Sequence, residues 1–243
     1  MAELAAAPRI NGLSPGTLFD AWRTTKGVAV RHDGTLADTD ALHLEAFNHV
    51  FGPRGHVFDR ARAATELQGF SSASISARFL PHEPPERQAA IMGEKEAVFR
   101  KLVAGKIQPV PGLMALLAIA DDADIPMVAV TNAPRLNAEM LLAGLGIMDR
   151  FHAVVIGDEL PHAKPHPLPY LEGLRAVNAA ANRSVAFEDS RSGIRSASDA
   201  GIATVGIRTS LSHADLVEAG ALLTAPAYDD RDLMTWLAAT MDW

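Results

Sequence analysis

The chain has 243 residues, of which 48% are hydrophobic and 21% charged, and it contains no cysteine. Its 22 lysines and arginines against 29 aspartates and glutamates give a formal net charge of −7, which argues against a nucleic-acid partner because no basic surplus faces the phosphate backbone. The lack of cysteine excludes disulfides, thiolate zinc sites and cysteine nucleophiles, and it fits a reducing, cytoplasmic location.

The sequence gives no sign of a membrane segment or a leader. The longest wholly apolar run extends only from Leu113 to Ala120, far short of the roughly 18–20 residues of a membrane helix. Residues 1–20 are rich in alanine, contain prolines and glycines, and lack a basic segment ahead of an apolar run. We therefore expect a loose N-terminal extension, no signal peptide and no membrane partner.

Short apolar, β-branched runs recur along the chain and are typical of strands buried on both faces. They cover residues 28–30, 127–131, 153–156, 185–187 and 204–207. Helix-compatible stretches at 137–145, 167–177 and 193–200 lie between the later runs. The alternation of strand and helix predicts an α/β protein with a Rossmann-like core of parallel strands.

The first two expected strands are separated by a segment much longer than an ordinary crossover. It contains four helix-compatible stretches, at 40–51, 60–68, 71–80 and 85–103. We therefore expect a small α-helical cap domain at 40–106, inserted into an α/β core formed by 21–39 and 107–243.

Polar and charged residues follow four of the expected strands at their ends. They are Arg31, Asp33 and Gly34 after the first, Thr131 and Asn132 after the second, Lys164 after the third, and Glu188 and Asp189 after the fourth. Ligands of open α/β sheets bind at the carboxyl ends of the strands. A hydroxyl, an ammonium and several carboxylates gathered there would suit a phosphoryl group and a hard divalent cation.

These segments resemble the motifs of the haloacid dehalogenase-like hydrolases, and within them the helical-cap branch of β-phosphoglucomutase and small sugar-phosphate phosphatases. Four segments, at 28–43, 128–132, 162–167 and 187–193, carry the resemblance, which extends over about 27–237. Each motif alone is weak, because Asp-Gly is an ordinary turn and Glu-Asp-Ser can cap a helix. Their common order at strand ends makes the resemblance specific.

The resemblance implies transfer of a phosphoryl group to an aspartate, followed by hydrolysis, with magnesium as cofactor. The family's acid/base aspartate falls on Asp33, its phosphate-binding hydroxyl on Thr131 and its charge-neutralising lysine on Lys164. The family's metal carboxylates fall on Glu188 and Asp189.

The resemblance also places Asp33 at the metal, and Gly34, Asn132 and His43 beside the substrate. Mutase-like members carry a basic residue in the cap just after a Gly-x-Ser segment. The corresponding stretch from Gly69 has no basic residue before Arg78, which favours a substrate with one phosphate.

The sequence departs from the family at the nucleophile, because Arg31 occupies the position of the phosphoryl-accepting aspartate. A guanidinium stays protonated and has no lone pair with which to attack phosphorus or bind a cation. Arg31 would instead take the place of the cation beside Asp189 or Glu188, or fork onto a bound phosphate.

Each candidate also has a purely structural reading. Lys164 could be a solvated lysine, Thr131 a β-branched strand residue, and His43 a surface histidine. Asp33 with Gly34 could form a simple turn, and Glu188 with Asp189 could cap a helix.

Two functions follow from these readings. One is a phosphohydrolase for a small phosphorylated metabolite such as a sugar phosphate, impaired by Arg31. The alternative is a catalytically silent phosphometabolite-binding or interaction protein on the same scaffold. In either case we expect a pocket between cap and core, lined by Asp33, Thr131, Lys164 and Asp189.

Overall fold

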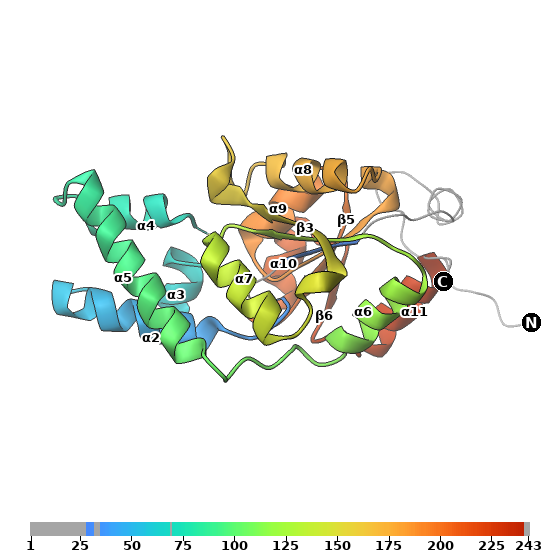
Figure 1. The fold of residues 1–243 in the computed structure, drawn as a ribbon, viewed down its shortest axis with the longest axis horizontal. Helices are drawn as coiled ribbons and strands as arrows, with labels where there is room; N and C mark the ends of the chain where they lie inside the picture. Colours follow the sequence, from blue (N-terminus) through green and yellow to red (C-terminus); the bar gives the residue numbers. More distant parts are fainter. Residues whose placement is uncertain (1–27, 32–34, 69, 241–243) are drawn as a thin grey trace, which may run out of the picture.

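The computed structural model describes residues 28–31, 35–68 and 70–240, and its centre is a parallel sheet (Figure 1). The strands are β1 (Val28–Arg31), β2 (Met127–Thr131), β3 (Phe151–Ile156), β4 (Val185–Glu188), β5 (Ala203–Ile207) and β6 (Leu223–Ala225). They lie in the order β3-β2-β1-β4-β5-β6, and every neighbouring pair is parallel. The predicted α/β fold class with a parallel core is confirmed.

Helices follow or precede the strands through the whole described part of the chain. The α-helices are α2 (Asp40–Phe51), α3 (Arg60–Glu66), α4 (Ser72–Phe79), α5 (Pro85–Val103), α6 (Leu113–Asp122), α7 (Arg135–Gly144), α8 (Leu168–Ala176), α9 (Arg191–Asp199), α10 (His213–Ala219) and α11 (Arg231–Thr240). Short 3-10 helices cover Gly52–Arg54, Met148–Arg150, Gly157–Glu159 and Ala181–Arg183. Among the helices described here, none is long and apolar enough to cross a membrane.

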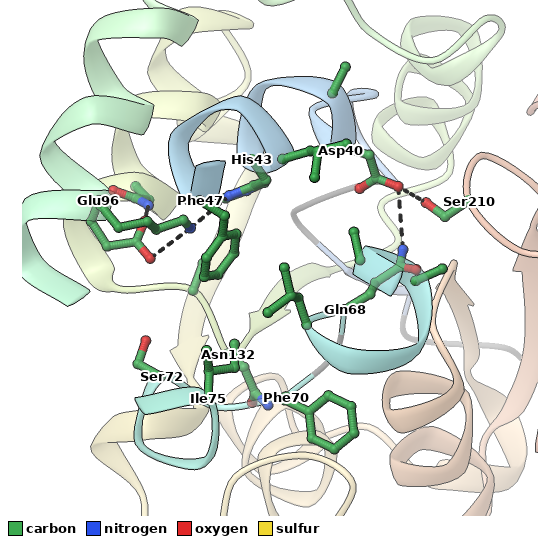
Figure 2. Close-up of a pocket in the computed structure, with 18 of the residues that line it drawn as sticks. Asp40, His43, Phe47, Gln68, Phe70, Ser72, Ile75, Glu96, Asn132 and Ser210 are labelled. Atoms are coloured by element: carbon green, nitrogen blue, oxygen red, sulfur yellow. Dashed lines mark hydrogen bonds and ion pairs between the residues drawn. The ribbon is translucent and has the colours of Figure 1, made fainter. Parts of the chain in front are cut away.

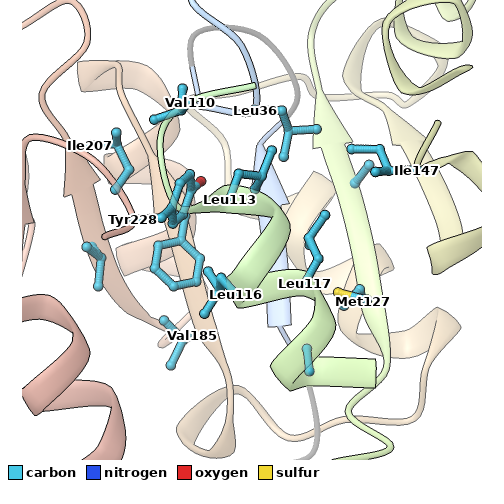
Figure 3. Close-up of a cluster of buried hydrophobic side chains, with 14 of the residues drawn as sticks. Leu36, Val110, Leu113, Leu116, Leu117, Met127, Ile147, Val185, Ile207 and Tyr228 are labelled. Atoms are coloured by element: carbon cyan, nitrogen blue, oxygen red, sulfur yellow. The ribbon is translucent and has the colours of Figure 1, made fainter. Parts of the chain in front are cut away.

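The sheet is covered by helices on both faces, because alternate residues of one strand point to opposite sides. In β2, Met127 and Ala129 belong to the apolar cluster with α6, α7 and α11, whereas Val128 and Val130 belong to the cluster with α8 and α9. Figure 3 shows the first cluster, in which Tyr228 packs beside leucines of α6. Strands β2 and β4 are buried along their whole length, as their apolar runs predicted.

Helices α2 to α5 lie at one end of the molecule, beside the sheet and outside it (Figure 1). They share an apolar cluster of their own, made of Phe47, Val50, Phe51, Phe58, Leu67, Ile75, Phe79, Leu80, Ile91 and Met92. Local signals start these helices: Asp59 caps α3, Ser71 caps α4, and Pro85 opens α5. The helical insertion after the first strand is thus present.

The two chain segments that link the insertion to the sheet run next to each other. Ala37 forms an isolated antiparallel bridge with Pro109, and the Val110 N–H donates to the Leu36 carbonyl at 2.9 Å. This pairing holds the two ends of the insertion next to each other. The division into a cap at 40–106 and a core at 21–39 and 107–243 stays a proposal, and the expected extension at 1–20 lies outside the described residues.

Element boundaries shifted by a few residues from the sequence-based expectations, and some elements were missed. Helices α7, α8 and α9 correspond to the expected stretches at 137–145, 167–177 and 193–200. Helices α6, α10 and α11 and strand β6 had no counterpart among the expectations. Strand β6 has only three residues and α10 only seven, so neither spans enough sequence to show a period.

Candidate functional site

The carboxyl ends of three central strands meet at one edge of the sheet. The register pairs Arg31 of β1 with Val130, so Arg31 lies beside the end of β2 at Thr131. On the other side of β1, strand β4 ends at Glu188. The backbone therefore gathers three expected site positions at this edge, while Asp33 and Gly34 lie outside the described residues.

Lys164 and Glu188 form a buried ion pair at this edge. The Lys164 Nζ lies 2.6 Å from Glu188 Oε1, and both side chains are almost fully buried. Lys164 Nζ also donates to the Val130 carbonyl at 2.8 Å, and the Tyr170 hydroxyl donates to Glu188 Oε1 at 2.6 Å. Because these hydrogen bonds replace lost hydration, the pair can be kept charged in the interior.

Asn132 holds the loop that carries Lys164. Its Oδ1 accepts the Lys164 N–H at 3.2 Å and its Nδ2 donates to the Lys164 carbonyl at 3.1 Å. Gly157 permits this arrangement, because a β-carbon there would lie 2.1 Å from Asn132 Oδ1. The structure thus places Asn132 as the residue that orients the Lys164 backbone.

Thr131 is a buried hydroxyl at the end of β2. It is 1% exposed, and its Oγ1 accepts the Ala133 N–H at 2.9 Å. Because that bond uses a lone pair of the oxygen, the hydroxyl hydrogen is left for a different acceptor. A phosphoryl oxygen at this edge would be such an acceptor.

Asp189 is buried beside hydroxyls from two distant segments. Thr35 Oγ1 donates to Asp189 Oδ1 at 3.2 Å, and Ser210 Oγ lies 3.4 Å from Asp189 Oδ2. The Ser210 hydroxyl also donates to Asp40, the first residue of α2, which accepts from Gln68 Nε2 at 3.4 Å. Ser210 therefore connects the sheet edge to the helical insertion.

Tyr228 brings an additional buried hydroxyl close to the carboxylates. Within the described part of the chain its hydroxyl has no hydrogen-bond partner, although the residue is 1% exposed. Burial raises the pKa of the Tyr228 phenol well above its ordinary value, and the charges of Asp189 and Glu188 add to this effect. The phenol therefore stays protonated.

A cavity of about 270 Å³ lies between the helical insertion and the sheet edge (Figure 2). Described residues that line it include Asp38, Asp40, His43, Gln68, Phe70, Ile75, Lys95, Glu96, Asn132, Asn137 and Ser210. Its walls thus combine apolar side chains with many polar and charged groups, so the cavity offers hydrogen-bond donors, acceptors and charges of both signs.

The sequence predicted a pocket between cap and core, lined by Asp33, Thr131, Lys164 and Asp189, and the cavity lies between the helical insertion and the sheet edge. Thr131, Lys164 and Asp189 are not among the described residues that line the cavity. All three are buried, and two residues of the lining contact them: Asn132 bonds the Lys164 backbone, and Ser210 Oγ lies 3.4 Å from Asp189 Oδ2. Asp33 lies outside the described residues.

His43 lines the cavity from α2. Its ring stacks on Phe99 with centroids 3.7 Å apart, and its Nδ1 lies 3.0 Å from Lys95 Nζ. The sequence left open a substrate-side polar group and a satisfied surface histidine, and the structure shows a half-buried ring whose Nδ1 is satisfied by Lys95. The role of His43 beside a substrate stays a prediction.

Sequence reasoning missed Tyr170, Lys95, Glu96, Asn137 and Ser210. A signal existed for two of them, because the buried stripe of α5 contains Ile91, Met92, Lys95, Glu96, Phe99 and Val103. Two adjacent charges inside an otherwise apolar stripe indicate a buried polar network. The other three residues carry no comparable pattern in the sequence.

The described side chains alone do not fit a magnesium ion. Glu188 is already paired with Lys164, which leaves Asp189 as the other carboxylate of this motif. In residues 35–68 and 70–240, no group of three or more histidine, aspartate or glutamate side chains is arranged to hold a metal. Magnesium prefers several oxygen ligands, so further ligands would have to come from outside these residues.

Fold and site together define an α/β protein with a Rossmann-like core, a helical insertion after the first strand, and a lysine–carboxylate edge below a cavity. The profile of the family described as haloacid dehalogenase-like hydrolase matches residues 32–207. The chain therefore belongs to the haloacid dehalogenase-like hydrolases.

Individual relatives are similar over most of the chain. Protein CbbY of Cereibacter sphaeroides is 34% identical, covering 70% of this chain and 78% of that protein. Fructose-1-phosphate phosphatase YqaB of Escherichia coli is 29% identical, covering 75% and 96%. The crystal structure of CbbY from Rhodobacter sphaeroides in complex with phosphate is 29% identical with a TM-score of 0.75, covering 85% and 96%.

Proposed function

We propose that this chain is a phosphomonoester hydrolase for a small phosphorylated sugar, with turnover impaired because Arg31 stands at the nucleophile position. The observation that carries the proposal is the gathering of Thr131, Lys164, Glu188 and Asp189 at one sheet edge below a cavity. Relatives named for phosphatase activity and for a phosphate complex support the substrate class.

In this proposal Thr131 donates a hydrogen bond to a phosphoryl oxygen, and Lys164 offsets the negative charge at the strand ends. Asp33 protonates the leaving oxygen of the ester, as the family resemblance implies. Gly34, His43 and Asn132 lie at the substrate. Magnesium is implied by the resemblance, but the described donors do not form its site, so no step is derived through it.

The substrate we propose has one phosphate. A cavity of about 270 Å³ suits a small metabolite. The cap segment from Phe70 to Ile75, where mutase-like members carry a basic residue, contains no lysine or arginine. Of the insertion's cations on the cavity, Lys95 is paired with Glu96, and Arg60 lies in α3.

The Arg31 position decides between this function and a second candidate, a phosphometabolite-binding protein without turnover. Loss of a covalent nucleophile commonly costs several orders of magnitude in rate, while binding can persist. A chain that binds a sugar phosphate and releases no phosphate would fit the second candidate.

The test is steady-state phosphate release from fructose 1-phosphate, with and without magnesium, by the natural chain, Arg31→Asp and Arg87→Asp. Arg87 is exposed on α5, so its substitution matches the change in charge far from the sheet edge. We expect little turnover by the natural chain and by Arg87→Asp, and magnesium-dependent turnover by Arg31→Asp. Equal magnesium-dependent rates in all three would place the nucleophile elsewhere and overturn the proposal.

A further inference from the structure

Helix α5 of the insertion and helix α7 of the core are joined by buried polar side chains. Asn137 of α7 is 1% exposed, and its Nδ2 donates to Glu96 Oε2 at 2.6 Å. Its Oδ1 accepts from Arg100 Nη1 at 2.9 Å. Because a carboxamide offers both a donor and an acceptor, this single side chain binds an anion and a cation one turn apart on α5.

The network continues from Glu96 to the wall of the cavity. Glu96 Oε1 accepts from Lys95 Nζ at 3.0 Å, and Lys95 Nζ lies 3.0 Å from His43 Nδ1. With Lys95 protonated in its ion pair with Glu96, its ammonium has no lone pair, which assigns His43 Nδ1 as the acceptor and places the hydrogen of a neutral ring on Nε2. Figure 2 shows Glu96 and His43 connected in this way beside the cavity.

We propose that Asn137 is a positioning residue: by holding Glu96 it orients Lys95 and His43 on the cavity wall and fixes α5 against the core. Both carboxylate oxygens of Glu96 accept a hydrogen bond, one from Asn137 and one from Lys95. Removing the Asn137 hydrogen bond frees the carboxylate to turn, and we expect Lys95, whose Nζ also lies 4.3 Å from the centre of the Phe47 ring, to shift with it. The ring of His43 then loses the contact that fixes its tautomer.

The proposal is tested by exchanging donor and acceptor groups without changing side-chain size. Asn137→Asp replaces the amide that donates to Glu96 with a carboxylate, so two negative groups meet at 2.6 Å. The double variant Glu96→Gln with Asn137→Asp restores a donor facing an acceptor, and residue 96 keeps an oxygen for Lys95. A role of Asn137 in packing alone gives no reason for such a rescue.

Asn48 provides a matched control. Its side chain also makes two hydrogen bonds, to the Phe58 carbonyl and from the Phe58 N–H, each at 2.8 Å. These bonds lie within the insertion and do not reach α7. Asn48→Asp should therefore lower stability without altering His43.

The primary measurement needs no ligand: long-range ¹⁵N–¹H NMR of the His43 ring in the full chain, with hydrogen exchange across α5 and α7. We expect the Nε2–H signature in the natural chain and the control, a changed ring signature and faster exchange in Asn137→Asp, and recovery in the double variant. An unchanged His43 in Asn137→Asp, or no recovery in the double variant, would overturn the proposal.

A second arm rests on the proposed function. Titration with fructose 1-phosphate should show roughly tenfold weaker binding to Asn137→Asp, with recovery in the double variant. If the natural chain does not bind the ester, the proposed substrate is wrong, while the NMR and exchange results still decide the role of Asn137. If binding is equal in all variants, Asn137 does not position the cavity wall for this ligand.

Discussion

Gly193 and Glu188 lie so close that no other residue than glycine fits at position 193 without movement. A β-carbon on Gly193 would lie 2.0 Å from Glu188 Oε2, although Glu188 is held by Lys164 and Tyr170. The glycine of the fourth sequence segment thus makes room for the buried carboxylate. The first turn of α9, capped by Ser190, passes directly against it.

We expect Gly193→Ala to push Glu188 away from Lys164 and to lower the free energy of unfolding by about 1–3 kcal/mol, as overpacking does. Gly93→Ala is the control, because Gly93 lies inside α5 with nothing within 4 Å of its added β-carbon. That substitution should stabilise the chain by about 0.5–1 kcal/mol. Urea denaturation of both variants checks this; equal effects would contradict the close approach.

Lys164→Met should be among the most damaging single substitutions, because it removes the ammonium that lies 2.6 Å from the buried Glu188 carboxylate. We expect a loss of about 3–5 kcal/mol of stability. Lys164→Met combined with Glu188→Gln should recover much of this loss, since both charges of the buried pair are removed together. Chemical denaturation of both variants and of the natural chain measures these free energies of unfolding. A double variant no more stable than Lys164→Met would contradict the view that the loss comes from breaking the buried ion pair.

Tyr228→Phe should be neutral or stabilising by about 1 kcal/mol, because it removes a buried hydroxyl with no partner in the described part of the chain. The raised pKa of Tyr228 adds a pH dependence. Above about pH 10 the phenol ionises only in the unfolded chain, which favours unfolding. Thermal unfolding between pH 8 and pH 11, roughly, should therefore show a smaller alkaline loss for Tyr228→Phe; a steeper loss would contradict this.

Asp158 should make the folded chain less stable as the pH rises through the acidic range. Partial desolvation, and to a lesser degree the Glu96 charge, raise the pKa of its carboxyl above 3.8. The folded state therefore holds its proton more tightly, and that stabilisation is lost as pH rises through the raised pKa. Asp158→Asn should flatten this part of the profile. Thermal melts from about pH 3 upward test it, with exposed Asp122→Asn as the control.

The sequence by itself determined five of the six strands, the helical insertion after the first of them, and the edge of the sheet at which Thr131 and Glu188 lie. Apolar runs near 127–131 and 185–187, bounded by turn signals, predicted strands buried on both faces, and the common direction of parallel strands brings Thr131 and Glu188 to one edge. The long first crossover likewise required an insertion. These inferences depend on the periodicity within each segment and on the order of the segments along the chain, and both can be read directly from the sequence.

Only the tertiary structure decided which side chains those residues meet. Tyr170 reaches Glu188 across a separation of 18 positions, and Asn137 reaches Glu96 across 41. Such partners are selected by how helices pack against the sheet and against one another, and a hydrogen bond forms only within a few tenths of an ångström of its proper length. Sequence spacing does not encode distances of that precision between segments that meet only after folding, so the ion pair, the close approach of Gly193 and the Asn137 network emerged from packing alone.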